Sequence, residues 1–285
     1  MSTTRTNSRG IPLLGLVALT LATAGCNPAR RAAEQIAEKN ATARGGLEAW
    51  RRVKTVSMSG TLEAGVPRDP LKLANTYVRA RTPQNAESRR AALKEVESPP
   101  KQLELPFVME LKRPRDNRLE IRFQGDTAVQ VYDGRNGWKL RPFLGRHEVE
   151  PFNDEELRQA SQQGDLDGLL IDASAKGNTL ELMGTEQVEG RDAYRIKVTT
   201  RAGSVRQVWV DTETNLEVRI DGTRTLDGKP RRVFTSFRDW RPEEGLLFAH
   251  TLETTVEGIV GSEKIKVERV TVNPELADSR FGKPR

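Results

Sequence analysis

Apolar and polar residues alternate along most of the chain from Thr55 onward. The segment Val56, Met58, Gly60 and Leu62 sets the pattern. It returns between turn-forming residues at 107–111, 119–123, 194–198, 205–210 and 265–272, among others, and residues 77–81 fit a further strand. A period of two is typical of strands buried on one face. The pattern predicts about ten or eleven short strands, most of them joined as hairpins.

Helical spacing is confined to two places. In residues 30–53, one helical face carries Ala33, Ile36, Ala37, Asn40 and Ala41. The pair Gly45-Gly46 then interrupts the pattern, which predicts two helices or one broken helix. Residues 154–163 form the second helical segment, with acidic residues in its first turn, where the helix dipole favours them. The apolar stretch at 166–171 follows it and is a candidate lid.

Many strands with few helices predict a mainly β (α+β) protein built on one large curved antiparallel sheet. A sheet of that many strands tends to curl. The helices are too few to cover one face completely, so we expect them to plug a concave face only in part.

The N-terminus has the order of a secretory signal. Arg5 and Arg9 precede an apolar stretch from Ile11 to Ala24, and the chain's single cysteine, Cys26, follows Gly25. This order is typical of an exported protein. It resembles a bacterial lipoprotein signal, although Thr23 stands where leucine is usual. We therefore expect a signal peptide at 1–25, a lipid anchor on Cys26 and a tether at 26–33.

Composition and motifs argue against most enzyme classes. The chain has 285 residues, one cysteine, two histidines and a net charge of +6. One cysteine excludes an internal disulfide and a cysteine-based zinc site. Phosphate-loop, dinucleotide, zinc-protease and serine-hydrolase motifs are missing. We expect no catalytic residues, no metal and no cofactor. Export makes nucleic acid a poor partner, and the basic balance fits weak attraction to anionic lipid better.

Short segments in a fixed order carry a family resemblance. They include Ala43-Arg44-Gly45-Gly46-Leu47 and Asp167-Gly168-Leu169-Leu170, and the others lie at 56–60, 118–120, 131–134, 137–138, 190–194, 210–214, 237–240, 245–250 and 272–275, with Phe281 beyond. Together they resemble the LolA/LolB-like superfamily, most closely its outer-membrane lipoprotein-sorting proteins. Ala249 departs from the proline expected there.

The resemblance spans residues 34–285, with an exposed insertion expected at 82–103. It implies a half-open antiparallel barrel with helices plugging the concave side. It also implies binding of acyl chains of lipids or lipoproteins, with a protein donor or acceptor in a sorting pathway. The location it implies is the bacterial cell envelope, on the periplasmic side. We prefer the outer membrane because Asn27, rather than aspartate, follows Cys26.

Strand alternation supplies candidate residues for the acyl cavity and its lid. The register decides which of the two faces they line. From the strands we expect Val56, Met58, Leu62, Met109, Leu111, Leu119, Ile121, Phe123, Val131, Trp138 and Leu140; from the lid we expect Trp50, Leu169 and Leu170. The same residues would form an ordinary core between sheet and helices, and this alternative stays open.

Two other functions remain as alternatives. The first is a periplasmic sensing or regulatory module of the same fold that binds a protein partner or a lipid signal, with the basic loop at 79–101 as its contact surface. The second is an enzyme that uses Asp165 and Asp167 with Tyr194 or His250 as a proton donor. Nothing in the sequence sets the geometry of these four residues.

Overall fold

The computed structural model describes residues 27–65, 102–142, 145–163, 165–226, 229–259 and 261–284. Its 13 strands form one antiparallel sheet that does not close into a barrel. The predicted fold class is therefore confirmed, with more strands than the sequence indicated. The expected signal peptide, Cys26, the expected strand at 77–81 and residues 82–101 of the expected insertion lie outside the described residues.

The strands are β1 (Thr55–Gly65), β2 (Gln102–Lys112), β3 (Asp116–Phe123), β4 (Asp126–Asp133), β5 (Gly137–Arg141), β6 (Arg146–Pro151), β7 (Thr179–Val188), β8 (Arg191–Thr199), β9 (Val205–Asp211), β10 (Glu217–Leu226), β11 (Lys229–Glu243), β12 (Leu246–Val256) and β13 (Ser262–Val272). The helices are α1 (Pro28–Ala43), α2 (Leu47–Arg52), α5 (Asp154–Gln163) and the short 3-10 turn η2 (Asp278–Phe281). None of the described helices is long and apolar enough to cross a membrane.

The strand order places the first and last strands side by side. It runs β6-β5-β4-β3-β2-β1-β13-β12-β11-β10-β9-β8-β7. Strands β1–β6 and β7–β13 are thus two meanders, joined in the sheet by the β1–β13 pair. In the chain they are joined by residues 152–178, which include α5.

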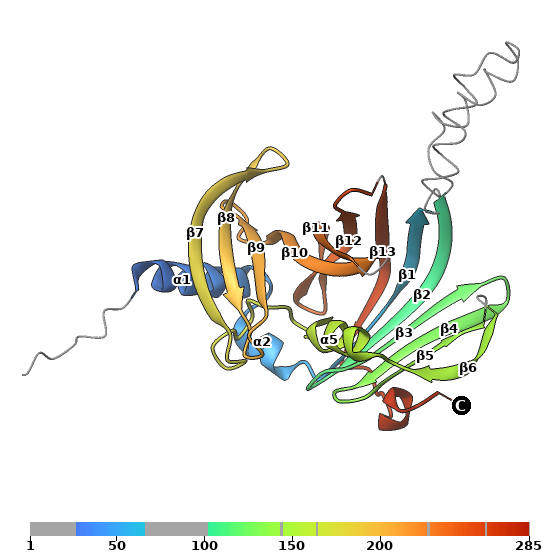
Figure 1. Cartoon of the computed structure of the whole chain (residues 1–285). Coiled ribbons are helices and arrows are strands. Elements are labelled where there is room, and N and C mark those ends of the chain that lie inside the picture. The colour runs from blue at the N-terminus through green and yellow to red at the C-terminus, as the bar shows by residue number, and fades with distance from the viewer. Residues whose placement is uncertain are drawn as a thin grey trace, which may run out of the picture.

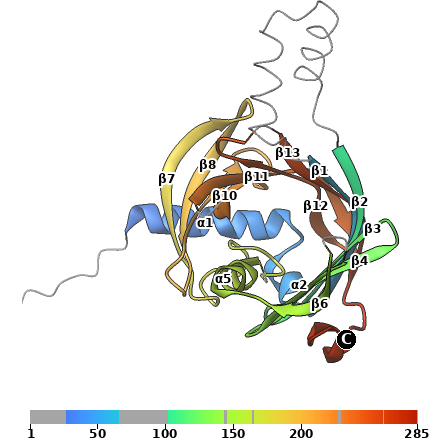
Figure 2. The same ribbon diagram turned by 45° about the vertical axis from the view of Figure 1, so that its right-hand side comes forward.

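The sheet curves around the helices. Figure 1 shows the strands sweeping from β7 round to β6. In Figure 2 helices α2 and α5 and the C-terminal part of α1 lie inside the arc, while the N-terminal end of α1 extends beyond β7. The C-terminal turn η2 lies outside the arc. We call the side that carries the three helices the inner face and the opposite side the outer face.

Helix α1 follows its sequence pattern. The Asn27 side chain accepts a hydrogen bond from the Ala29 amide at 3.0 Å, and Pro28 occupies the first turn, where a missing amide costs nothing. The buried residues are those of the predicted face: Ala33, Ile36, Ala37, Asn40 and Ala41. Because the helix begins at Pro28, residues 28–33 belong to it, which corrects the expected tether.

Two boundaries differ from the sequence interpretation for physical reasons. Strand β2 begins at Gln102, so residues 102–103 extend a strand rather than ending the insertion, because they pair with Ala64 and Gly65. Beyond Asn273, outside the two segments where helical spacing was expected, the chain forms the turn η2, whose Phe281 is buried. A single aromatic residue after a proline gives no periodic signal, so this turn could not be read from the pattern.

Candidate functional site

Two rows of apolar side chains cross the inner face from strand to strand. Residues directly opposite in antiparallel strands share a face. The first row is Phe237, Leu252, Ile265, Leu62 and Leu105, on β11, β12, β13, β1 and β2. The second row is Val270, Met58, Met109 and Leu119, on β13, β1, β2 and β3.

The two rows are only partly covered. Leu105 and Val270 are buried, whereas the other members of both rows keep part of their surface exposed. The helices therefore leave apolar surface on the concave side of the sheet. Contiguous apolar surface of this kind on a concave face is typical of a ligand site.

Helix α2 and the segment at 165–171 form the plug over this surface. Trp50 is fully buried, and its ring lies 5.1 Å from that of Phe248 on β12. Leu166 and Ile171 pack in the same cluster as Trp50. The Trp50 indole N–H donates to the Arg44 carbonyl at 3.0 Å, so the buried polar atom of the tryptophan is satisfied.

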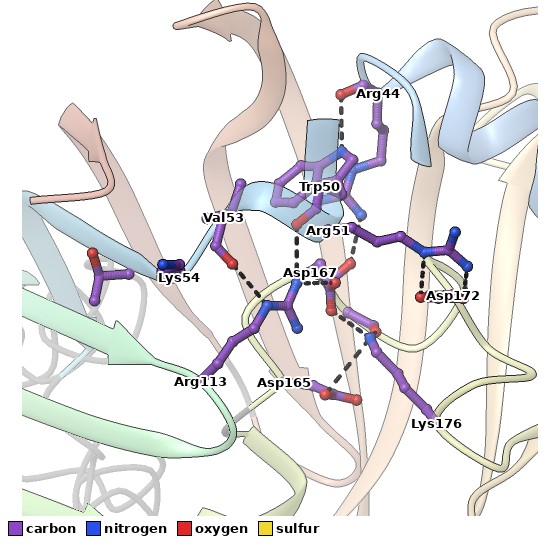
Figure 3. Close-up of polar contacts among 12 residues, drawn as sticks. Arg44, Trp50, Arg51, Val53, Lys54, Arg113, Asp165, Asp167, Asp172 and Lys176 are labelled. Atoms are coloured by element: carbon purple, nitrogen blue, oxygen red, sulfur yellow. Dashed lines mark hydrogen bonds and ion pairs between the residues drawn. The ribbon is translucent and has the colours of Figure 1, made fainter. Parts of the chain in front are cut away.

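An ionic cluster fixes the plug to the turn between β2 and β3 (Figure 3). The buried Asp167 carboxylate accepts from Arg113 Nη2 at 2.6 Å and also pairs with Lys176. Arg113 Nε donates to the Val53 carbonyl at 2.8 Å. Lys176 donates to the Gly168 carbonyl at 2.6 Å. Charge-assisted hydrogen bonds thereby hold the start of the segment at 165–171 to the β2–β3 turn and to Lys176 further along the chain.

A second buried ion pair ties helix α1 to the sheet. Arg44 Nη1 lies 3.1 Å from Glu217 Oε1, and both side chains are less than a tenth exposed. Asn40 donates to the same carboxylate at 2.9 Å. Arg44 also donates to the Asp167 carbonyl at 3.0 Å. Arg44 therefore connects both plug elements, because its carbonyl accepts from Trp50 of α2 and its guanidinium donates to the segment at 165–171.

A pocket lies between α5 and strands β2–β4. Its volume is about 100 Å³, and it is lined by apolar groups such as Met109 and Leu119 and by polar groups such as Gln130 and Gln159. Glu156 of α5 pairs with Lys139 of β5 at 2.5 Å, and Glu155, its neighbour, accepts from Thr225 of β10 at 3.1 Å. The first turn of α5 thus bridges two walls of the curved sheet.

Neither a scan of the sequence against protein-family models nor a search of curated proteins gives a match. Solved structures do match. A LolA superfamily protein from Nitrosomonas europaea superposes with a TM-score of 0.54 at 11% identity, over 88% of this chain and 97% of that one. A DUF1329 family protein from Desulfovibrio piger gives 0.51 at 13% identity, over 89% and 97%.

The chain has the LolA-like fold. The fold places most of the strand candidates together: Val56, Met58, Leu62, Met109, Leu111, Leu119 and Ile121 share one cluster with Trp50. Phe123 lies two residues beyond Ile121 on the same face of β3, at the β3–β4 turn. These residues line the inner face of the LolA-like sheet.

Three strand candidates lie on the outer face instead. Leu119 is opposite Gln130, so these two residues share the inner face. Val129 and Val131, the neighbours of Gln130 in β4, therefore point to the outer face. Val131 is opposite Trp138, and Val129 is opposite Leu140. Val131, Trp138 and Leu140 pack with Phe281 of the C-terminal turn. Their assignment to the cavity is therefore wrong, because a register offset of one residue exchanges the two faces.

The lid candidates Leu169 and Leu170 lie in the LolA-like fold under the other half of the sheet. They pack with α1 and with Ile196 and Val208 of β8 and β9. They lie in the segment at 165–171, but they contact a different cluster from that of Trp50. The segment at 165–171 therefore contributes to both apolar clusters.

The residues considered for proton transfer have other partners. Asp167 is held by Arg113 and Lys176, and Lys176 also lies 3.6 Å from Asp165. His250 is 2% exposed, with Nδ1 2.8 Å from the Val267 carbonyl and Nε2 3.1 Å from Glu243. Tyr194 packs beside α1. Lys176 links the two aspartates, and no contact among the described residues joins them to Tyr194 or His250.

Proposed function

We propose that the chain is a membrane-anchored lipid- or lipoprotein-binding protein that holds acyl chains on the inner face of its sheet. The observation that carries this proposal is the pair of apolar rows, most of whose members stay partly exposed, under a plug that is held by ion pairs. Burying acyl chains is worth about 0.8 kcal/mol per methylene, so such a surface gains affinity with each carbon it covers. No catalytic group is needed for holding and releasing a chain.

Release requires two states of similar free energy. With no lipid bound, the plug residues cover part of the apolar surface. A bound acyl chain replaces those contacts, so it shifts the plug toward an open state only by its difference in affinity for the two states. The ion pairs of Asp167 set how much that opening costs. Transfer of a lipidated cargo then follows from binding alone.

The proposed location is the periplasmic side of the outer membrane, with a lipid on Cys26. The signal-like order of residues 1–26 supports it. A lipid anchor suits a tethered receptor better than a diffusing shuttle. In lipoprotein sorting, the protein partner of such a receptor would be a donor or an acceptor. Labelled palmitate should enter the wild-type chain and not a Cys26→Ser variant, which should leave the membrane fraction.

Native mass spectrometry after extraction from membranes tests acyl binding. We expect lipid adducts on the wild-type chain and uptake of an added acyl probe. Leu252→Gln, on the first apolar row, should reduce uptake. Its neighbour Thr251 points to the outer face, so Thr251→Gln is the matched control and should bind as the wild type does. A chain that never carries lipid and takes up no probe contradicts the proposal.

A further inference from the structure

Three arginines lie on neighbouring strands at one end of the inner face. Ile220 packs against the α1 side of the sheet, and residues two apart in a strand share a face, so Gly222 and Arg224 of β10 point inward. Arg231 of β11 is directly opposite Arg224. Arg206 of β9 follows the same alternation from Val208. Like charges directly opposite in a sheet are destabilising, so this pair has a cost.

Arg206 has little compensation for its charge. Its Nε donates to the Asp221 carbonyl, and the nearest carboxylate oxygen, on Asp221, is 3.9 Å away. That carboxylate already accepts from the Gln207 amide at 2.6 Å and from Arg232 at 3.1 Å. Burial lowers the pKa of the Arg206 guanidinium. Among the described residues, nothing accepts a hydrogen bond from its two terminal nitrogens.

A glycine makes room for this guanidinium. A Cβ at Gly222 would stand 3.0 Å from Arg206 Nη2 and 3.1 Å from a methyl group of Val233. The terminal nitrogens of Arg206 therefore lie flat against the backbone of β10, on the inner side. The Arg206 side chain as a whole stays 20% exposed.

The other two arginines surround the same end. Arg224 Nη1 reaches Glu263 of β13 at 2.9 and 3.0 Å, across β11 and β12. Arg231 has no ion pair among the described residues, and its Nη1 lies beside Gly258 in the β12–β13 turn. A second carboxylate, Glu155 of α5, approaches through Thr225 but is paired with Arg158. Positive charge therefore exceeds negative charge at this end.

The arginines continue the apolar rows. Along β11, inward residues run from Phe237 through Thr235 and Val233 to Arg231. At about 3.3 Å per residue, Arg231 lies about 20 Å along β11 from Phe237 in the first apolar row. Val233, which is opposite Gly222, lies about 13 Å from Phe237. These distances are comparable to the length of a long acyl chain. An amphiphile could place its tail on the rows and its head at the arginines.

We propose that Arg206, Arg224 and Arg231 bind the phosphate headgroup of an anionic lipid whose acyl chain lies on the apolar rows. The inference rests on the proposed function and names the class of lipid. Guanidinium groups match phosphate geometry by paired hydrogen bonds. The bound phosphate would also remove the repulsion between Arg224 and Arg231.

Binding of three probes to the purified chain, measured by calorimetry, tests the inference. Palmitoyl lysophosphatidic acid and monopalmitin share a tail and differ by the phosphate, and inorganic phosphate has no tail. We expect the phospholipid to bind at least about tenfold more tightly than monopalmitin, because charge-assisted hydrogen bonds are added. Arg206→Gln with Arg231→Gln should abolish that difference and leave monopalmitin binding unchanged, which also shows that the variant is folded.

Arg122→Gln with Arg269→Gln is the matched control, because both arginines are exposed on the outer face, on β3 and β13, and the pair removes the same two charges. It should keep the preference for the phospholipid. Equal binding of the two lipids by the wild-type chain would overturn this inference alone. Binding of neither lipid would overturn the proposed function as well. If inorganic phosphate binds as tightly as the phospholipid, the site binds a free anion, and the assignment of an anionic lipid as its ligand is wrong.

Discussion

Asp167 and Arg113 connect the plug to the sheet by one hydrogen bond of 2.6 Å, from Arg113 Nη2 to the buried carboxylate. Asp167 is fully enclosed, whereas the Arg113 side chain is 31% exposed. The same guanidinium holds the Trp50 carbonyl at 3.2 Å. One arginine therefore restrains both α2 and the segment at 165–171.

Replacing Asp167 with asparagine should loosen the plug. The change leaves Arg113 and Lys176 without their shared carboxylate, and we expect a loss of about 2–3 kcal/mol in the free energy of unfolding, less than for a fully buried pair. Chemical denaturation measures the loss, and hydrogen exchange should rise at 165–178. An increase in hydrogen exchange that is confined to other regions would show that Asp167 does not restrain the plug.

Removing the Phe281 ring should affect stability without affecting lipid binding. Phe281 is 2% exposed and packs on Val129 and Val131 on the outer face. Phe281→Ala leaves a cavity there, so we expect a loss of about 3 kcal/mol in denaturation. Acyl probe uptake by the folded variant should equal that of the wild type. Reduced uptake would mean that the two faces are coupled.

Gly60 allows β1 and β13 to approach closely. A Cβ at this position would stand 1.9 Å from the Lys266 carbonyl oxygen, at the register shift between the two strands. Gly60→Ala should therefore cost about 2 kcal/mol or more, since backbone must move. Thermal melting compares it with Ser59→Ala, which should change stability by less than about 0.5 kcal/mol. Equal melting temperatures would contradict the close approach.

The Arg51–Asp172 pair should make stability depend on acid. Arg51 Nε and Nη2 each donate to the Asp172 carboxylate at 2.9 Å. These hydrogen bonds hold the pKa of Asp172 below its ordinary value of 3.8. The folded state thus binds the proton less readily than the unfolded state. The pair's contribution is present above 3.8 and is lost as pH falls through the lowered pKa.

Melting temperatures measured from neutral pH downward test this dependence. The wild type should lose more stability below pH 3.8 than Asp172→Asn does, because the variant has no proton to gain there. Because the pair is exposed, we expect the difference to be small and reduced by salt. Parallel curves for the two proteins would exclude the pair as an acid-sensitive contact.

Local patterns predicted the elements but not how they face each other. Alternation at 107–111 and 119–123 identified strands, and Asp154–Gln163 is the helix its charges and spacing predicted. Strand β6 was missed because its sequence carries only one apolar residue besides proline, and an edge strand needs no buried face. The elements that were predicted and the strand that was missed both follow from residues adjacent in the sequence.

The site was predicted in part for the same reason. Met58, Met109 and Leu119 were grouped correctly, since their strands are linked by regular register. Val131 was placed with them, yet it faces outward, because the β3–β4 pairing sets Gln130 opposite Leu119. The three arginines were not predicted either. Arg206, Arg224 and Arg231 come together only through pairing across β9, β10 and β11, which composition does not reveal.

The strand order has a consequence for motion. The two meanders share only the β1–β13 pair in the sheet, and the chain crosses between them through residues 152–178. The part of the plug at 165–171 belongs to this connection, so displacing it in the proposed opening would break no strand pairing. A chain cut within that connection would still possess two complete meanders able to reassociate by complementation. The proposed opening would thus disturb the contacts of this connection and leave the ladder of strand pairs intact.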